Sequence, residues 1–324
     1  MTGQADELAN GIREAYERIK ADIARTPIEY SEPLSRETGA RVFVKWECDQ
    51  RTGSFKLRGA LNKLRSLSPA DRARGVVSAS TGNHGLAISH AAGLEGVGLK
   101  LFLPETVAEV KRSRIEALGV DVEVRGASCD KAEALARAFA GETGRVFVSP
   151  YNDWDIVRGA GTVALELDED LDRFDDVLVP VGGGGLIAGL AGFLKAVRPA
   201  VRVVGVEPVT TAFMAASLAA GRLVDIEEKA TIADAVAGGI EPGSITFPLC
   251  RDFVDAVVCV PEERIVQAMA LVHGRQGRMI EGAGALPFAA LLESPRRFRG
   301  RAVVAVVSGA NIAPERFRAV AGPA

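Results

Sequence analysis

Aromatic side chains, cysteine and histidine are all scarce in this sequence of 324 residues, which holds four cysteines and three histidines. The cysteines show no Cys-x-x-Cys spacing and have no histidine near them in the sequence: Cys48, Cys129, Cys250 and Cys259. Thiols paired at short spacing, or grouped with histidine, are the usual signs of a disulfide framework or a zinc site. We therefore predict buried thiols and no metal site.

Long apolar runs and an excess of one charge are also missing. Apolar runs such as Val303–Val307 are far too short to cross a bilayer, and the polar, acidic start at Met1–Asn10 does not resemble a signal peptide. The 39 lysines and arginines are offset by 42 aspartates and glutamates, which gives a formal net charge of −3. This balance argues against nucleic acid or an anionic membrane as a partner. We expect a cytoplasmic protein.

Short apolar runs alternate with helical patterns along most of the chain, which is long enough for two domains. Helices are predicted at 8–23, 56–64, 86–92, 110–118, 130–140, 152–167, 186–196, 262–272 and 282–292, with an interruption near Gly159 and Gly161. Strands are predicted at 42–47, 75–80, 99–104, 121–124, 146–148, 176–181, 201–206, 256–260 and 302–307. This alternation predicts an α/β fold of two doubly wound, mostly parallel sheets flanked by helices. We expect a large domain from 1–74 and 152–324, and a small mobile domain from 75–151.

Lys56 lies in the segment Gln50–Ala60, behind the turn Gly53-Ser54-Phe55 and at the start of an apolar helical stripe. A single lysine in such a position is usually a solvated side chain on an amphipathic helix. Here, three further polar or glycine-rich clusters each follow a predicted strand, and open α/β sheets bind ligands at the carboxyl ends of their strands. The four clusters together fit a ligand with a pyridine ring, a phosphate and an aldehyde.

The glycine run Gly182–Gly185 is the first of these clusters, between a strand and a helix. Backbone N–H groups of such a turn can converge on an anion together with the helix N-terminus. The run lacks the spacing of dinucleotide and nucleoside-triphosphate loops, so a phosphate monoester fits best. A tight turn needed only for helix–strand packing is the alternative.

The other two clusters offer hydrogen bonds at strand ends. Ser80-Thr81-Gly82-Asn83-His84 can give hydroxyl and N–H groups to a carboxylate and an amide to a phenolic oxygen, while Ser308 can donate to a pyridine nitrogen without transferring a proton. His84 is a possible general base, although a lone loop histidine is more often structural. A serine at a strand end is often only a helix cap.

These motifs, in this order, resemble the fold-type II pyridoxal-phosphate enzymes, and within them the serine/threonine dehydratases and serine racemase. The resemblance runs from Arg25-Thr-Pro27 to Ser308-Gly-Ala-Asn311, which is nearly the whole chain. It implies a tryptophan synthase β-like fold, pyridoxal 5'-phosphate as cofactor and a homodimer.

The resemblance also implies a role for each motif residue. Lys56 would form the Schiff base with the cofactor and later move the Cα proton. The other residues implied to hold the cofactor are Phe55 against the ring, Asn83 on the ring 3-oxygen, Gly182, Gly183, Gly184 and Gly185 on the phosphate, Glu281 near the ring nitrogen side, and Ser308 at the ring nitrogen. Those implied to face the substrate are Ser80, Thr81, Gly82 and His84, with Tyr151 as a further pocket residue. Thr81 is also implied to be a catalytic residue beside Lys56.

Three departures from the family pattern bear on the activity. Thr81 stands where racemases of this type have a serine, and its methyl group crowds that face of the ring. No carboxylate follows Glu207-Pro208 closely, so the divalent-cation site of some relatives is not expected. Arg158 replaces a small apolar residue and could bind a second substrate carboxylate, although a surface arginine that pairs with Asp155 is the alternative.

The sequence thus predicts a pyridoxal-phosphate-dependent ammonia-lyase that converts L-threonine, L-serine or a similar β-hydroxy amino acid to a 2-oxo acid and ammonia. A 3-hydroxyaspartate dehydratase and an amino-acid racemase are the alternative enzymes. A ligand-binding protein without catalytic activity is a more distant alternative, because such a protein would not need the lysine.

Overall fold

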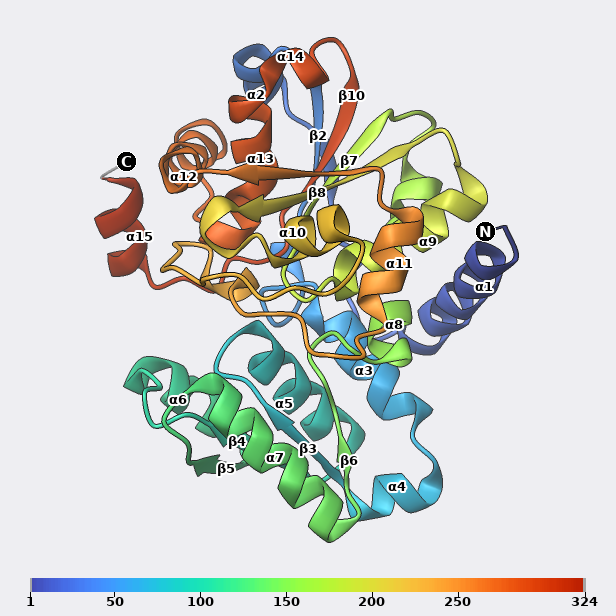
Figure 1. Ribbon diagram of the computed structural model, residues 1–324, viewed down its shortest axis with the longest axis vertical. Helices are drawn as coiled ribbons and strands as arrows, with labels where there is room; N and C mark the ends of the chain where they lie inside the picture. The colour runs from blue at the N-terminus through green and yellow to red at the C-terminus, as the bar shows by residue number, and fades with distance from the viewer. Residues whose placement is uncertain (1, 323–324) are drawn as a thin grey trace.

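Two separate sheets form the centres of two lobes in the computed structural model, which describes residues 2–322 (Figure 1). The larger sheet has six strands in the order β1-β2-β10-β7-β8-β9, and only β1 is antiparallel to its neighbour. The smaller sheet has four parallel strands in the order β5-β4-β3-β6. The predicted α/β fold with two mostly parallel sheets is confirmed.

Nine of the ten strands agree closely with the predicted runs, and β1 was not predicted. In chain order the strands are β1 Ile28–Tyr30, β2 Arg41–Lys45, β3 Val76–Ala79, β4 Leu99–Leu103, β5 Asp121–Val124, β6 Val146–Phe147, β7 Asp176–Pro180, β8 Arg202–Pro208, β9 Ala256–Val260 and β10 Ala302–Val306. Strands β7 and β10 are buried along their whole length, as is usual for parallel strands covered on both faces. The four strands of the smaller sheet all lie within 76–147. The exact domain boundaries and the mobility of the small lobe stay predictions.

Helices cover both faces of each sheet (Figure 1). They are α1 Thr2–Ile19, α2 Glu32–Thr38, α3 Lys56–Ser66, α4 Pro69–Arg74, α5 Asn83–Glu95, α6 Glu109–Glu116, α7 Cys129–Thr143, α8 Trp154–Asp170, α9 Gly185–Val197, α10 Phe213–Ala220, α11 Thr246–Phe253, α12 Glu262–Gln276, α13 Gly282–Glu293, α14 Pro295–Phe298 and α15 Pro314–Ala321. Single 3-10 turns occupy Glu47–Asp49 (η1), Val209–Thr211 (η2) and Asp234–Val236 (η3). Among residues 2–322, no helix is long and apolar enough to cross a membrane.

Two details of the sequence prediction were wrong. Helix α8 runs without a break through Gly159, because this glycine lies where α8 packs closely against α3: a Cβ there would be 2.5 Å from the Arg58 carbonyl oxygen. The prediction of buried thiols holds fully only for Cys250. Cys129 is exposed as the first residue of α7, and the other two cysteines are partly exposed.

A buried charge cluster, made of Lys45, Glu47, Arg58 and Glu166, ties β2, η1, α3 and α8 together. Glu166 accepts from Arg58 Nη1 at 2.7 Å and from Lys45 Nζ at 2.6 Å, and Glu47 accepts from Arg58 Nε at 2.8 Å. All four side chains are fully buried. Two cations and two anions therefore neutralise one another where water cannot solvate them, and each depends on its partners.

Glu166→Ala should lower the free energy of unfolding by about 3–5 kcal/mol, because it leaves buried cations without a partner. Arg36→Ala is the matched control, since it removes an ion pair with Glu32 in which both side chains are mostly exposed; its effect should stay below about 1 kcal/mol. Urea unfolding followed by circular dichroism measures both. Equal losses in the two variants would contradict the role given to the cluster.

Candidate active site

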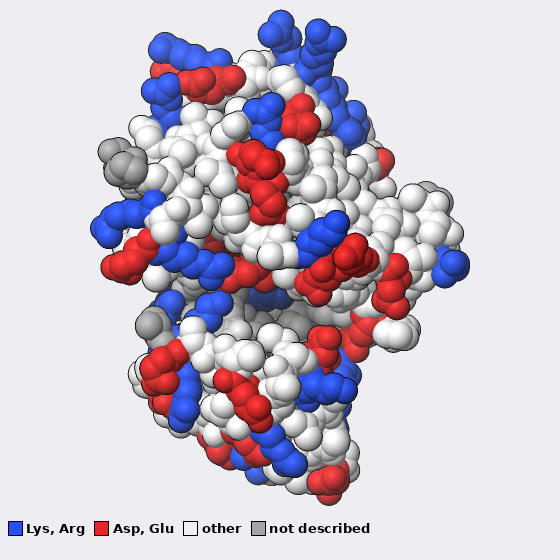
Figure 2. Space-filling model, turned by 60° about the vertical axis from the view of Figure 1, so that its left-hand side comes forward, with Lys and Arg blue, Asp and Glu red and all other residues white. Residues whose placement is uncertain are grey.

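Most of the predicted site residues lie in segments where loops of both lobes face each other. The space-filling view shows a hollow between the lobes, with basic side chains gathered at one end of it (Figure 2). The loop after β3 comes from the small lobe, and the loops after β7 and β10 come from the large lobe. Carboxyl ends of parallel strands are the usual ligand-binding edge of such sheets.

Lys56 is the first residue of α3, and its Nζ donates to the Pro150 carbonyl oxygen at 2.8 Å. The amine lies 5.1 Å from the centre of the Phe55 ring. Burial lowers the pKa of Lys56 to about 8, against the charge of Glu281, which acts to raise it. A substantial fraction of this amine is therefore neutral at mildly alkaline pH, as a nucleophile or base requires.

The loop before Lys56 is attached to the end of β10. Phe55 N donates to the Ser308 carbonyl oxygen at 3.1 Å, and Ser54 forms an isolated bridge with Gly309. Ser308 is buried at this junction. The hydroxyl oxygens of Thr52 and Ser54 are buried without a hydrogen-bond partner among the described residues. The junction thus places Ser308 and two unused polar atoms beside the start of α3.

Asn83 and Glu281 are brought together from the two lobes. Asn83 Nδ2 donates to Glu281 Oε1 at 2.6 Å, and both side chains are buried. Burial raises the pKa of Glu281 to about 7, although the hydrogen bond from Asn83 acts to lower it. A Cβ at Gly309 would lie 2.5 Å from Glu281 Oε1 and 3.0 Å from Asn83 Nδ2, so only glycine fits beside this pair.

The glycine run forms the turn between β7 and the N-terminus of α9. Gly184 has a φ of +88°, which favours glycine. A Cβ at Gly183 would lie 2.4 Å from ring atoms of Tyr151, so a side chain could not be added without displacing that ring. The Tyr151 hydroxyl accepts from Glu241 N at 2.9 Å. The turn therefore has no side chains over its backbone N–H groups next to a helix N-terminus, as an anion-binding site requires.

The 80–84 loop divides into an accessible part and a buried part. Ser80, Thr81 and Gly82 are partly exposed at the end of β3. His84 is buried, and its Nε2 lies 3.0 Å from Ser78 Oγ, whose hydrogen is donated to the Val148 carbonyl oxygen. Burial, helped by the charge of Lys56, lowers the pKa of His84 to about 3. His84 is thus a neutral, hydrogen-bonded histidine here and cannot offer a positive charge to a carboxylate.

The contacts of Arg158 lie outside this group, and its assignment as a substrate ligand stays a prediction. Its side chain packs against α1, where a Cβ at Gly11 would be 2.6 Å from Nε. The guanidinium lies over the Trp154 ring at 5.8 Å and is 4.0 Å from Asp155. The helical position of Arg158, close in sequence to the expected pocket residue Tyr151, did not reveal that its side chain points to α1. The alternative of an arginine beside Asp155 is the one the structure supports.

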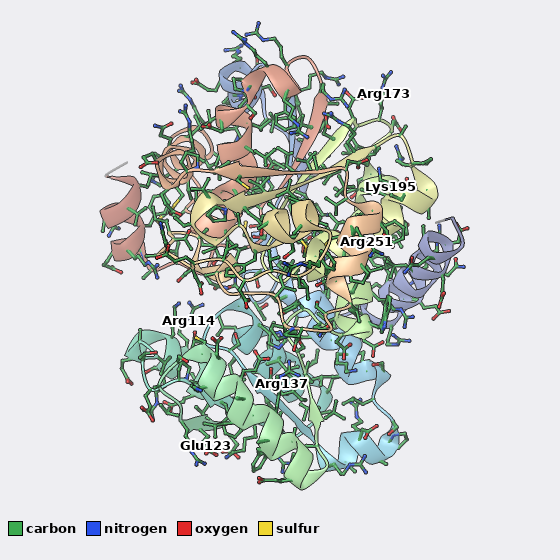
Figure 3. The ribbon with its side chains drawn as sticks, in the orientation of Figure 1. Arg114, Glu123, Arg137, Arg173, Lys195 and Arg251 are labelled. Atoms are coloured by element: carbon green, nitrogen blue, oxygen red, sulfur yellow. The ribbon has the colours of Figure 1, made fainter. Side chains whose placement is uncertain are left out.

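Asn311 is the site residue whose role the sequence analysis missed. Its side chain donates to Asn83 Oδ1 at 2.7 Å and to the Thr52 carbonyl oxygen at 2.9 Å. It also accepts at 3.0 Å from Arg114, which reaches the boundary between the lobes from α6 (Figure 3). The Ser308–Asn311 motif contains this asparagine, but only the fold shows that it contacts a residue of the other lobe.

Pyridoxal phosphate fits these residues. The site offers an amine of lowered pKa for the aldehyde, a bare glycine turn for the phosphate, an amide for the ring oxygen and a buried hydroxyl for the ring nitrogen. The residues that would hold it are Phe55, Lys56, Asn83, Gly182, Gly183, Gly184, Gly185, Glu281 and Ser308. When bound, the cofactor accepts into its pyridine ring the electron pair left at Cα after a proton is removed.

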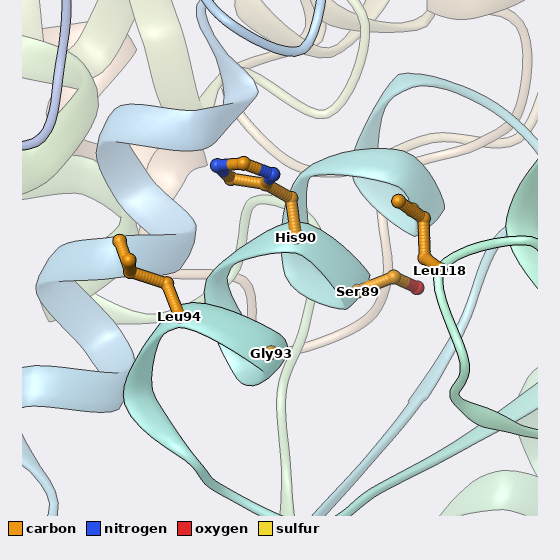
Figure 4. Close-up of a pocket in the computed structure, with 5 residues that line it drawn as sticks. All are labelled: Ser89, His90, Gly93, Leu94 and Leu118. Atoms are coloured by element: carbon orange, nitrogen blue, oxygen red, sulfur yellow. The ribbon is translucent and has the colours of Figure 1, made fainter.

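Two further observations concern the rest of the surface. A separate hollow of about 270 Å³ lies along α5, away from the strand ends, and contains none of these residues (Figure 4). It is lined by Ser89, His90, Gly93, Leu94 and Leu118. Within residues 2–322, no three His, Cys, Asp or Glu side chains are grouped as metal ligands would be.

The pH dependence of Lys56 acylation tests its environment. In protein stripped of cofactor, the rate of modification at Lys56 should rise with a midpoint near pH 8, compared with about 10.4 for an ordinary lysine. Glu281→Gln should move the midpoint lower, because the charge that raises the Lys56 pKa is lost. The modified tryptic peptide is quantified by mass spectrometry. A midpoint above pH 10 would contradict the buried amine.

Comparisons with known proteins agree with this site. The family described as "Pyridoxal-phosphate dependent enzyme" matches residues 19–309. A putative threonine dehydratase of Sinorhizobium fredii is 42% identical over 312 residues, which cover 95% of this chain and 94% of the relative. An L-threonine ammonia-lyase of Thermotoga maritima is 40% identical over 93% of this chain and 75% of its own.

A solved structure shows the same arrangement. Maize serine racemase superposes with a TM-score of 0.90 at 34% identity, and the match covers 94% of each chain. Since the family match spans most of the sequence and both curated relatives exceed 30% identity over most of their length, the chain belongs to the pyridoxal-phosphate dependent enzymes.

Proposed function

We propose that this protein is a pyridoxal-phosphate-dependent ammonia-lyase that converts L-threonine or L-serine to the 2-oxo acid and ammonia. The observation that carries the proposal is the Lys56 amine, whose pKa is lowered to about 8 beside the Asn83–Glu281 pair and the glycine turn. The relatives named as threonine dehydratase and threonine ammonia-lyase support the substrate class.

Lys56 has two tasks in this proposal. Its neutral amine would hold the cofactor through the aldehyde, and once a substrate amine has taken that place, the same amine would accept the Cα proton. The Pro150 carbonyl oxygen, which accepts from Nζ at 2.8 Å, gives the amine a defined position between these events. The β-hydroxyl of the substrate would leave as water with the proton that Lys56 has accepted, and a second water would then release ammonia and the 2-oxo acid.

The other residues orient the ligands. The turn Gly182–Gly185 would hold the phosphate through backbone N–H groups, and Ser308 would donate to the ring nitrogen without protonating the ring. Ser80, Thr81 and Gly82, which are partly exposed at the end of β3, bind the substrate carboxylate. Tyr151, packed on the glycine turn, borders the substrate side of the same site.

Thr81 favours elimination over racemisation. A racemase needs an acid on the second face of the ring, and relatives that racemise place a serine at this position. The threonine hydroxyl is accompanied by a methyl group, which crowds proton return to that face. Arg158 packs against α1, so the structure offers no support for a second substrate carboxylate from this residue and hence for 3-hydroxyaspartate.

We further propose that the enzyme works in the cytoplasm as a homodimer and that the 75–151 lobe moves during turnover. The resemblance to dehydratases and the position of the site between two lobes motivate this. Light scattering on the purified protein tests the oligomeric state, and a molar mass of one chain would contradict the dimer.

A substrate panel tests the proposed activity. L-Threonine or L-serine should yield 2-oxo acid, and D-serine and the 3-hydroxyaspartates should yield much less. Lys56→Ala should reduce the rate at least roughly 100-fold, because both the covalent link and the base are lost. Lys229→Ala, which changes an exposed lysine, is the matched control and should retain the rate.

Two outcomes would overturn the assignment. Conversion of L-serine to D-serine without 2-oxo acid, followed by chiral chromatography, would indicate a racemase. Bound cofactor with no reaction of any substrate would leave the non-catalytic alternative.

A further inference from the structure

Asn311 has an unusually complete set of hydrogen bonds. Its Nδ2 donates to Asn83 Oδ1 at 2.7 Å and to the Thr52 carbonyl oxygen at 2.9 Å, while its backbone N donates to Glu281 Oε2 at 3.1 Å. Its Oδ1 accepts from Arg114 Nη2 at 3.0 Å. Both side-chain hydrogens and the carbonyl oxygen are therefore in use, and an amide turned by 180° would lose all three side-chain contacts.

The orientation of Asn311 determines the orientation of Asn83. Asn83 accepts from Asn311 at Oδ1 and donates to Glu281 through Nδ2. A turned Asn83 would place two N–H donors against each other and its own oxygen against the Glu281 carboxylate. In the observed orientation, the contacts within residues 2–322 use one Nδ2 hydrogen of Asn83 and leave the second for a ligand, so the group that Asn83 presents is a donor.

Arg114 holds Asn311 from the opposite lobe. It lies on α6 of the small lobe, and Figure 3 shows it at the boundary with the large lobe. A guanidinium can only donate hydrogen bonds. Arg114 can therefore bind the carbonyl oxygen of the Asn311 amide but not its NH2 group. On the other side Gly53, with a φ of +75°, leaves room for the asparagine: a Cβ there would be 2.7 Å from Asn311 Oδ1.

We infer that Asn311 is a positioning residue that makes Asn83 present an N–H to the cofactor, and that Arg114 acts through Asn311 from the small lobe. This inference rests on the proposed function, since it assumes that Asn83 meets the ring 3-oxygen. Arg114 can contact Asn311 only when the two lobes lie together. The position of the small lobe would therefore affect the hydrogen bond to the cofactor ring.

The test uses cofactor binding and the visible absorption of the bound cofactor, both of which are read without turnover. Asn311→Asp keeps the size of the side chain and can pair with Arg114, but it cannot donate to Asn83. It should weaken cofactor binding roughly 2- to 10-fold, the effect of one hydrogen bond, and shift the absorption in the direction that Asn83→Ala does. Arg114→Ala should give a smaller shift in the same direction.

Arg112→Ala is the matched control, because Arg112 lies on the same helix and, among residues 2–322, forms an ion pair only with the exposed Glu116. It should bind cofactor as the wild type does. Thermal melting of each variant shows whether it is folded; if Asn311→Asp is not, Arg114→Ala, whose side chain lies at the surface, still decides the question.

Wild-type affinity and absorption in both Asn311→Asp and Arg114→Ala would overturn the inference. So would a shift in Arg112→Ala equal to that in Arg114→Ala, since it would show a general effect of α6. These results differ from a failure of the proposed function, in which the wild type itself would bind cofactor but release no 2-oxo acid from threonine or serine.

Discussion

Partial burial of the Lys56 amine, which lowers its pKa, is the constraint on which the rest of the site depends. A solvated lysine is almost fully protonated at neutral pH and is neither a nucleophile nor a base. Lys56 lies at the first residue of α3, where the helix dipole also disfavours a positive charge. The first turn of α3 must therefore be fixed where the amine is poorly solvated. Two sets of contacts fix it there.

The first set joins the 52–55 loop to the end of β10, and the second is the buried charge cluster. Arg58 lies two residues after Lys56 and is bound by Glu47 and Glu166 beneath the helix. Arginine at this place offers several fixed donors at once, which suits a buried contact to two carboxylates. The cluster costs desolvation energy, but it defines where the first turn of α3 lies.

Contacts between the lobes have a different character. The buried pair of Asn83 and Glu281 lies at the centre, while the pairs Arg137–Glu241 and Lys111–Asp234 lie at the exposed rim. Exposed ion pairs contribute little stability and are screened by salt. The rim pairs therefore add little to the stability of this boundary, and the buried central hydrogen bonds define how the two lobes meet.

The fold and the main site motifs could be predicted because their signals are local. The apolar runs that become β7 and β10 and the glycine run between β7 and α9 are visible without knowing what they pack against. Other features depend on contacts across the fold. Strand β1 has three residues and a largely exposed pattern, which gives no periodic signal. The roles of Asn311 and Gly159 depend on neighbours that are distant in sequence, and so does the direction in which Arg158 points.

Borohydride reduction of the cofactor-loaded protein, followed by tryptic mapping, shows directly which lysine carries the cofactor. Reduction makes the bond between the cofactor and a lysine permanent, and trypsin does not cleave after the modified residue. If Lys56 carries the cofactor, the added mass is expected on the peptide Thr52–Arg58, which contains this lysine. A cofactor mass on a peptide with any other lysine, or none after reduction, would contradict it.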